Sequence, residues 1–144
     1  IDSIETAADR AISFLDTLHN QLDVLSTYDE FPIELDLPNG HLSGLIDHLV
    51  VTPDAYHIVD YKTDRKRDDE SIDEFLTRRA THHEPQVLAY AAALSNADHD
   101  RTVSATLFFT AVDAAKTWDP DETTDAYEKT IETIRAATVE LDSD

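Results

Sequence analysis

Two apolar stretches separated by a short turn carry ionisable residues where a buried strand would normally have none. The first, LIDHLVV, contains Asp47, and the second, AYHIVDYK, contains Asp60 and Lys62. Burying a charge in a strand is costly unless the charge is paired or binds a ligand. The three residues therefore need a common partner or a chemical role, and a divalent metal ion would supply both.

The spacing brings these residues to one place. Side chains alternate between the faces of a strand, so Asp60 and Lys62 point to the same face. The turn signal TPD at residues 52–54 favours an antiparallel pair in which Asp47 approaches Asp60. Two neighbouring carboxylates favour a compensating cation, and oxygen ligands suit Mg²⁺ or Mn²⁺. With Lys62 beside the metal, this is the layout of metal-assisted phosphodiester hydrolysis.

Four ordered motifs, EFP, GLID, IVDYK and QVLAY, resemble the nuclease domain of the RecB/AddA group within the PD-(D/E)xK superfamily. The matched positions are Glu30 and Pro32, Gly44 and Asp47, Asp60 and Lys62, and Gln86 and Tyr90. Ile33 departs from the pattern, which has an aromatic residue there. The resemblance implies a restriction-endonuclease-like α/β fold, with a mixed β-sheet flanked by helices in the order α-β-β-β-α-β-α.

The resemblance also implies roles. Asp47 and Asp60, with the main-chain carbonyl of Tyr61, would bind Mg²⁺ or Mn²⁺, and Lys62 would act on the attacking water or the transition state. Gln86 and Tyr90 share a helix face at a spacing of four residues and would steady the lysine or contact DNA. Taken alone, both would read as packing residues.

One family feature is missing. These nucleases carry a metal-binding histidine in a G-T-x-x-H helix upstream, and the nearest candidate here, His19, lacks the glycine. The chain begins at Ile1 and contains no methionine. We therefore expect residues 1–144 to be a single nuclease domain cut from a larger RecB/AddA-like or UvrD/Rep-like helicase-nuclease.

That reading predicts a Mg²⁺-dependent exonuclease that acts on DNA in double-strand-break repair and recombination. ATP would bind only in the missing helicase portion, and the partners would be DNA and helicase domains of the same polypeptide or of another subunit. Two alternatives stay open: a catalytically degenerate nuclease fold that guides DNA or docks a subunit, and a stand-alone nuclease without a motor.

Composition narrows the class of protein. The length of 144 residues suits one domain with its own core. Cysteine is absent, which excludes disulfides, Cys-ligated zinc and the iron–sulfur subclass of RecB-like nucleases. No apolar run approaches the roughly 20 residues of a membrane span. We expect a soluble cytoplasmic protein with no membrane partner.

The net charge of −20 is unusual for a DNA-binding protein. Asp outnumbers Glu by 21 to 10 and the acidity is spread along the chain, which resembles the halophilic composition of salt-in organisms. Of 11 basic residues, six lie between Lys62 and Arg79. The predicted DNA-binding residues are Arg65, Lys66, Arg67, Arg78 and Arg79. The alternative is that these cations pair with neighbouring acids, namely Asp68, Asp69 and Glu70.

Periodicity predicts the elements. A helical stripe runs from Ile4 to Leu22, strands follow at 30–37, 42–51, 55–62 and 102–110, and a last helix spans 123–141. Pro85 predicts the first turn of a second helix. Residues 64–71 and 113–121 are expected to be loops, the first of them mobile. His48 and His57 are expected to pack on the faces opposite the aspartates, and adjacent His82, His83 and Glu84 to diverge into solvent rather than bind zinc.

Overall fold

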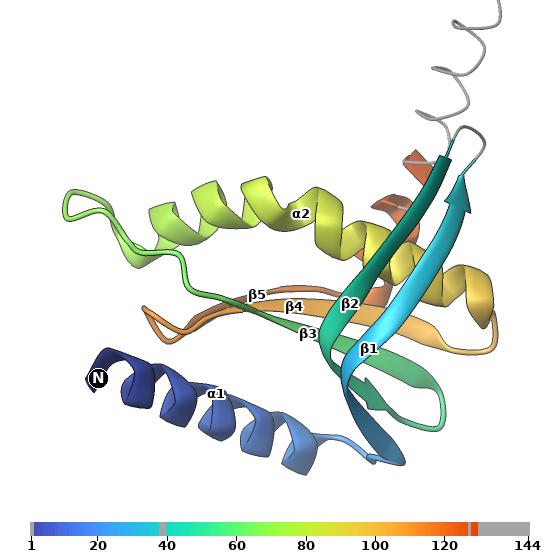
Figure 1. The fold of residues 1–144 in the computed structure, drawn as a ribbon, viewed down its shortest axis with the longest axis horizontal. Coiled ribbons are helices and arrows are strands. Elements are labelled where there is room, and N and C mark those ends of the chain that lie inside the picture. The colour runs from blue at the N-terminus through green and yellow to red at the C-terminus, as the bar shows by residue number, and fades with distance from the viewer. Residues whose placement is uncertain (1, 38–39, 127, 130–144) are drawn as a thin grey trace, which may run out of the picture.

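A computed structural model describes residues 2–37, 40–126 and 128–129 of the chain. Its elements are α1 (Asp2–Gln21), β1 (Ser26–Leu37), β2 (Gly40–Val51), β3 (Ala55–Lys62), α2 (Ile72–Ala97), β4 (Thr102–Phe109) and β5 (Ala114–Trp118). Residues 120–126 and 128–129 are also helical, and the rest of the helix expected over 123–141 lies outside the described residues. The predicted α/β class is confirmed (Figure 1).

The five strands form one mixed sheet in the order β1-β2-β3-β4-β5. The neighbours β3 and β4 are parallel, because α2 carries the chain back between them, and the other pairs are antiparallel. The carboxyl ends of β3 and β4 therefore meet at one edge, where Lys62 pairs with Phe109. The segment that follows β3 begins beside the predicted site.

The loop predicted over residues 113–121 was wrong in part. Residues Ala114–Trp118 form β5, which pairs with β4 from Phe109↔Ala114 to Ala105↔Trp118. Asp113 makes the turn with a φ of 52°. The sequence of β5 has little strand character by itself, and pairing with β4 and burial of Trp118 supply its stability.

The predicted start of the second helix was also wrong. It begins at Ile72, and a capping box at its start joins Ser71 and Glu74 through both reciprocal hydrogen bonds. Pro85 lies inside this helix and removes one backbone donor without ending it. Among the described residues, no helix is both long enough and apolar enough to cross a membrane.

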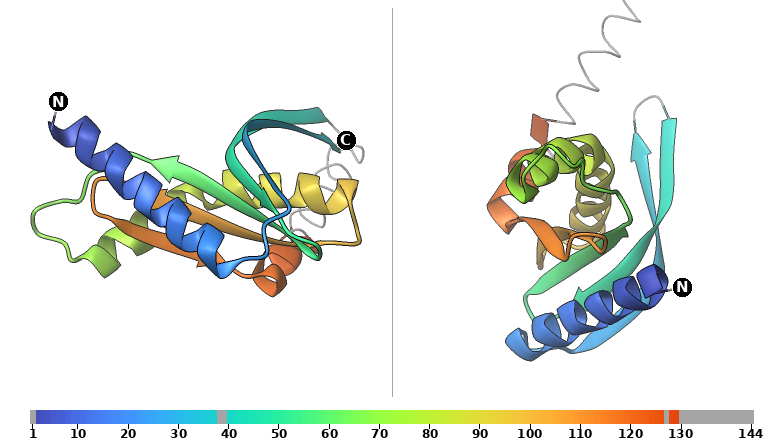
Figure 2. Two further views of the ribbon diagram at one scale, coloured as in Figure 1. Left: turned by 90° about the horizontal axis from the view of Figure 1, so that it is seen from below. Right: turned by 90° about the vertical axis from the view of Figure 1, so that its left-hand side faces the viewer.

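Helices cover both faces of the sheet, as predicted (Figures 1 and 2). The helix α2 packs Phe75 and Val87, both fully buried, into a core with Ile58 and Phe109. On the other face, the Phe14 ring of α1 stacks on Phe108 with the ring centroids 4.6 Å apart. The predicted catalytic positions on β3 face α2.

The β1–β2 hairpin bends out of the plane of the other strands and rises beside α2 (Figure 2). Glu30, which lies between the register pairs Asp29↔His48 and Phe31↔Ile46, has a φ of 51°. A non-glycine residue in this left-handed region is uncommon and marks a local distortion of the strand. Beyond the bend, Ile33 and Ile46 join the core under α2.

Candidate active site

The two aspartates lie where the ladder between β2 and β3 ends. Its last register pair is His48↔Val59, and Asp47 and Asp60 are the next residues outward on the two strands. The main-chain N–H of Tyr61 donates to Asp47 Oδ2 at 2.9 Å, so this side chain fixes the end of β2 against β3. Asp60 is only 4% exposed. We refer to Asp47 and Asp60 as the carboxylate pair.

The carboxylate pair carries more negative charge than its surroundings compensate. Burial raises the pKa of Asp47 to about 6, with further contributions from its hydrogen bond to Asp60 and from the charge of that residue. The Tyr61 N–H and Lys62 act in the opposite direction and do not cancel the increase. A site of this kind stabilises either a proton or a cation.

Among the described residues, Lys62 is the only one whose ammonium group contacts the pair. Its Nζ lies 2.9 Å from Asp60 Oδ2 and donates a hydrogen bond to Gln86 Oε1 at 3.1 Å. One positive charge thus faces two carboxylates, and Gln86 holds the lysine from α2. The structure therefore brings together residues from β2, β3 and α2 that the sequence motifs placed in one group.

Tyr90, one turn after Gln86 on α2, explains the glycine of the GLID motif. A Cβ atom added to Gly44 would lie 2.9 Å from both the Oη and a ring carbon of Tyr90, closer than such atoms normally approach. Only glycine lets the hairpin approach the helix this closely. The charges of Asp60 and Asp47 also contribute to the raised pKa of Tyr90, after burial, so its hydroxyl lies near the carboxylate pair.

Two of the predicted DNA-binding residues are engaged within the protein. Arg78 donates two hydrogen bonds to Glu70, and Arg79 pairs with Asp64, which also contacts His83. We refer to these residues, Asp64, Glu70, Arg78, Arg79 and His83, as the arginine cluster. It ties the segment after Lys62 to α2. The helical spacing of Arg79, His83 and Gln86 was the available sequence signal for it.

Charges in the arginine cluster are well compensated. The Arg78 guanidinium, followed by the main-chain N–H of Arg67, holds the pKa of Glu70 at about 2. Burial opposes the ionisation of Asp64, but hydrogen bonds from His83 and Arg79 outweigh it and lower the pKa of Asp64. Segment 63–71 is irregular, as predicted, and is well organised by hydrogen bonds.

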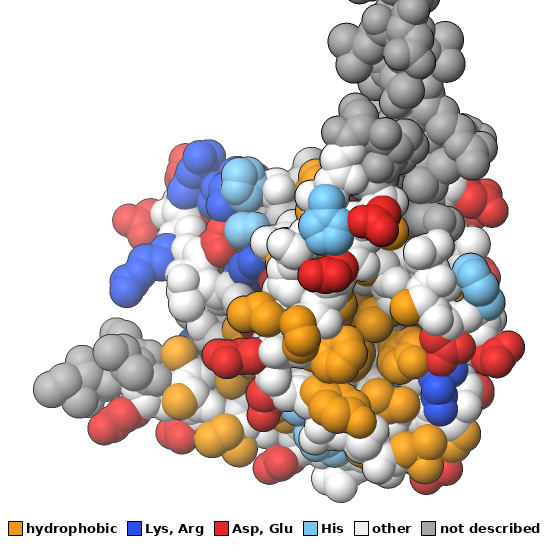
Figure 3. Space-filling view, turned by 45° about the vertical axis from the view of Figure 1, so that its right-hand side comes forward, with side chains coloured by type: hydrophobic (Ala, Val, Ile, Leu, Met, Phe, Trp, Pro, Cys, Tyr) orange, Lys and Arg blue, Asp and Glu red, His pale blue; other side chains and the backbone are white. Residues whose placement is uncertain are grey.

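The remaining predicted cations differ from one another. Lys66 donates to the main-chain oxygens of Arg67 and Glu70, which closes the turn. The side chains of Arg65 and Arg67 are exposed and make no hydrogen bond or ion pair with other described residues. Most Lys and Arg side chains visible in Figure 3 gather at one end of the molecule, whereas acidic side chains are spread over the surface.

The histidines lie away from the carboxylate pair. The ring of His19 contacts His48, whose side chain lies on the opposite face of β2 from Asp47. His57, on the same face as His48, bonds Ser104. His83 and Glu84 diverge, as predicted, but the prediction that they extend into solvent was wrong: His83 contacts Asp64, and Glu84 accepts from the indole N–H of Trp118.

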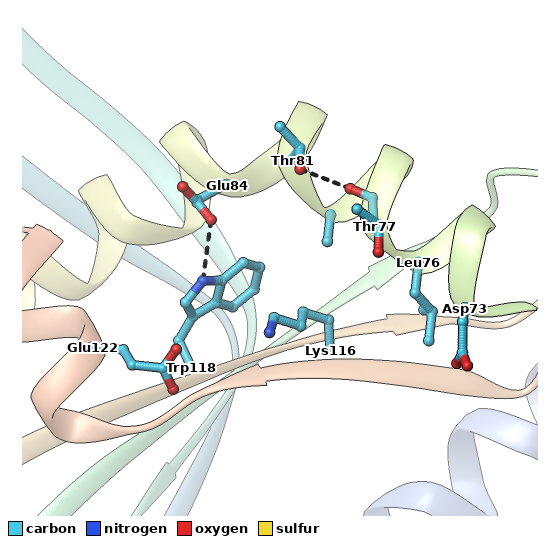
Figure 4. A pocket seen from close by; sticks show the side chains of 9 residues that line it. Asp73, Leu76, Thr77, Thr81, Glu84, Lys116, Trp118 and Glu122 are labelled. Carbon is cyan, nitrogen blue, oxygen red and sulfur yellow. Dashed lines mark hydrogen bonds between the residues drawn. The ribbon is translucent and has the colours of Figure 1, made fainter.

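A hollow of about 440 Å³ lies between α2 and β5, separate from these groups, and Figure 4 shows the side chains that line it. Trp118 and Lys116 line it from β5, and Glu84 lines it from α2. None of the predicted catalytic or DNA-binding residues contributes to its wall. The hollow therefore lies apart from the predicted catalytic residues, which gather at the carboxylate pair.

A divalent cation fits the donor set of the carboxylate pair. Asp47, whose pKa is raised by burial and by the neighbouring Asp60, would ionise readily beside a hard cation, and the Tyr61 carbonyl would add a further oxygen. Within the described part of the chain, no group of three or more His, Cys, Asp or Glu side chains has the arrangement of a metal site. Water and substrate oxygens would have to complete the shell, which suits Mg²⁺.

Comparison with known proteins gives a match over nearly the whole chain. The family model described as the PD-(D/E)XK nuclease superfamily matches residues 4–142. No curated protein matches the sequence. The match covers every element that contributes to the carboxylate pair and to the arginine cluster, and it agrees with a restriction-endonuclease-like fold.

Proposed function

Because this chain belongs to the PD-(D/E)XK nuclease superfamily, we propose that it hydrolyses DNA phosphodiester bonds with a divalent metal ion at the carboxylate pair. The observation that supports this most directly is the pairing of Asp47 and Asp60 with a single compensating ammonium group. Such an excess of buried negative charge is unfavourable for stability unless a cation joins it. Asp47, Asp60 and the Tyr61 carbonyl would hold Mg²⁺ or Mn²⁺.

The bound metal ion would lower the pKa of a water molecule and offset charge on the phosphate oxygens. The protein supplies the geometry. Asp60 and Asp47 are fixed by the strand ends and by the Tyr61 N–H. Gln86 holds Lys62 beside Asp60, where its ammonium group would orient the water and stabilise the pentavalent phosphorus.

The reaction is a direct hydrolysis. A bond forms between the water oxygen and phosphorus, the bond from phosphorus to the leaving sugar oxygen breaks, and the proton lost by the water passes to solvent. The leaving oxygen takes up a proton from solvent. Water is the nucleophile, so no covalent enzyme intermediate forms.

DNA would approach along the segment that follows β3. The exposed guanidinium groups of Arg65 and Arg67 lie a few residues beyond Lys62, and the arginine cluster holds their backbone. Phosphate contacts position a nucleic acid without reading its sequence. We propose that Arg65 and Arg67 make these contacts, whereas Arg78 and Arg79 act by organising the segment.

The wider setting follows from the motif resemblance alone. A RecB/AddA-like nuclease would act on DNA fed by ATP-driven helicase domains, in double-strand-break repair or recombination. Four parts of this setting stay predictions: the exonuclease polarity, the helicase partner, the cytoplasmic location and the halophilic source. Reading the coding sequence upstream of Ile1 for helicase motifs would test the motor, and cleavage assays on the parent protein would test polarity.

Metal binding provides the direct test. Calorimetric titration with Mn²⁺ should show weak binding to the chain and none to Asp60→Asn, because the variant removes a charged ligand. Asp113→Asn, which removes a carboxylate from the turn between β4 and β5, is a matched control and should bind as the parent does. Equal Mn²⁺ affinity in the parent and Asp60→Asn would remove the carboxylate pair from consideration.

The second candidate is a degenerate nuclease fold that guides DNA or docks a subunit. It is favoured by one observation: the described residues offer only two side-chain ligands at the proposed metal position. Metal-dependent cleavage by the full-length protein would distinguish the two. If that protein bound DNA and Mn²⁺ but left the DNA intact, the docking role would replace hydrolysis.

A further inference from the structure

Two histidines on the face of the sheet away from the carboxylate pair point their ring nitrogens at each other. His19, near the end of α1, and His48, on β2, have their Nε2 atoms 3.1 Å apart. His48 is 4% exposed. Its Nδ1 lies 2.7 Å from Asp29 Oδ1 on the neighbouring strand β1. The three residues form a chain from helix to sheet that the proposed nuclease chemistry does not use.

The contact with Asp29 determines which nitrogen of His48 carries a proton. A carboxylate only accepts hydrogen bonds, so the proton of neutral His48 sits on Nδ1 and donates to Asp29. The Nε2 of His48 is then a lone pair directed at α1. A histidine whose second nitrogen donates to a carboxylate is the usual arrangement of a metal ligand, because the carboxylate orients the ring and raises its basicity.

The separation of the two nitrogens suits a shared metal ion. Two Zn–N bonds of about 2.0–2.1 Å at a tetrahedral angle place the nitrogens about 3.3 Å apart, and at a right angle about 2.9 Å. The observed 3.1 Å lies between these values. We propose that His19 and His48 bind one borderline transition-metal ion, with Zn²⁺ as the reference ion and Asp29 as the residue that orients His48.

This histidine site differs from the carboxylate pair in chemistry and in place. Imidazole ligands favour Zn²⁺, Co²⁺ or Ni²⁺, whereas carboxylate and carbonyl oxygens favour Mg²⁺ or Mn²⁺. His48 and Asp47 are successive residues of β2 and point to opposite faces. The histidine site has two protein ligands, and solvent would complete its shell because His19 is only partly buried.

A metal ion at this position would cross-link α1 to the sheet. Apart from the histidines, the polar and aromatic contacts that the described side chains of α1 make with the sheet and the loop after β4 are the Phe14–Phe108 stack and the bonds from Arg10 to the main-chain oxygens of Thr110 and Ala111. A ligand that binds only the folded chain stabilises it by mass action. The site therefore extends beyond the proposed nuclease function and gives the chain a metal-dependent stability.

Zn²⁺ calorimetry and Co²⁺ absorption on the full chain test the proposal. The parent and Asp60→Asn should each bind one ion at this site with the same affinity, and Zn²⁺ should raise their melting midpoints. His19→Ala and the isosteric His19→Gln should lose at least about tenfold in affinity, and Asp29→Asn about 10- to 100-fold. His99→Ala, which alters an exposed histidine, is the control.

The outcomes separate this proposal from the nuclease function. If His19→Gln binds Zn²⁺ and Co²⁺ as the parent does, the two rings share only a hydrogen bond and the proposal fails. If binding is lost in Asp60→Asn instead, the ion sits at the carboxylate pair and the proposal also fails. Mg²⁺-dependent DNA cleavage should survive His19→Gln in either case, since that residue contacts no part of the carboxylate pair.

Discussion

The arginine cluster follows the carboxylate pair along the chain, yet the pKa values of acidic residues are shifted in opposite directions at the two sites. At the carboxylate pair, burial raises the pKa of Asp47 to about 6, and Lys62 faces two acids. In the arginine cluster, the Arg78 guanidinium lowers the pKa of Glu70 to about 2. The first site holds uncompensated charge, and in the second each acid has a cationic partner.

This difference in pKa shift distinguishes a site suited to binding a ligand from a site that stabilises the fold. An acid whose partners are all supplied by the protein is fully satisfied in the folded chain, and its removal should cost stability. An acid that is buried without enough cations is unfavourable in the isolated protein and favourable only when a ligand joins it. Each site holds two acidic residues, so the balance of partners is the informative quantity. The predictions below test that balance.

The largest effect is expected from Lys62→Ala, which removes the ammonium group that contacts the carboxylate pair. The loss of a transition-state charge contact typically costs about 3 kcal/mol, so DNA degradation should fall at least about 10²-fold. If the parent protein carries the helicase domains expected from the motif resemblance, its ATP-driven unwinding should continue. Lys116→Ala, on β5, should cleave normally. If Lys62→Ala degrades DNA at the parent rate, the hydrolytic reading is wrong.

Gly44→Ala should disturb the contact between β2 and α2 that orders the carboxylate pair. The added methyl group would meet the Tyr90 ring at 2.9 Å, and overpacking of this kind costs about 1–3 kcal/mol. Gly40→Ala is a matched control, because a Cβ there has no neighbour within 4 Å. Thermal unfolding measures both. An unchanged melting midpoint in Gly44→Ala would mean that Tyr90 moves freely and does not position the site.

Arginines of equal charge should differ in role: Arg65 and Arg67 should contribute to DNA binding, whereas Arg78 in the arginine cluster should contribute to stability. Replacing Arg65 and Arg67 by Ala should weaken DNA binding roughly tenfold and reduce the slope of log affinity against log salt by almost one for each residue. Arg78→Ala should lower the melting midpoint and leave that slope unchanged, since Glu70 already occupies its guanidinium. Fluorescence anisotropy with duplex and single-stranded DNA over a salt series measures both. Equal slopes in all variants would remove the distinction.

Local patterns predicted most of the fold, and long-range partners decided the rest. Strand alternation placed Asp60 and Lys62 on one face, and the turn at residues 52–54 brought Asp47 to them. The contact of Lys62 with Gln86 spans 24 residues and was expected only from the family resemblance. No local pattern distinguishes an arginine that meets a carboxylate from one that faces solvent, because this depends on how segment 63–71 folds.

Two elements, α2 and β5, were predicted incorrectly from the sequence. The residues Ser71 and Glu74 form the capping box at the start of α2, whereas the prediction rested on Pro85 and placed this start too late. The strand β5 has a weak pattern and forms because β4 offers an unpaired edge. Tertiary context overrode local propensity in β5, whereas the start of α2 follows its local capping signal.

The smallest expected effect is a change in the free energy of unfolding, and its sign should differ between the carboxylate pair and the arginine cluster. The pKa of Asp47 is raised from 3.8 to about 6, so its ionisation destabilises the folded chain above about pH 6, and this penalty disappears as the pH falls towards 3.8. In metal-free buffer, Asp47→Asn should therefore increase the free energy of unfolding by about 1 kcal/mol near pH 8, allowing for solvent screening. The gain should vanish near about pH 4.

Glu70→Gln should change stability in the opposite direction. The pKa of Glu70 is lowered from 4.5 to about 2, so its carboxylate stabilises the fold above about pH 4.5, and this contribution is lost as the pH falls towards 2. The variant should be less stable than the parent near neutral pH and equal to it in strong acid. Urea unfolding followed by the fluorescence of Trp118, the single and buried tryptophan, measures both variants. A loss of stability in Asp47→Asn at about pH 8 would show that the carboxylate pair is already compensated, because an uncompensated charge cannot be stabilising there.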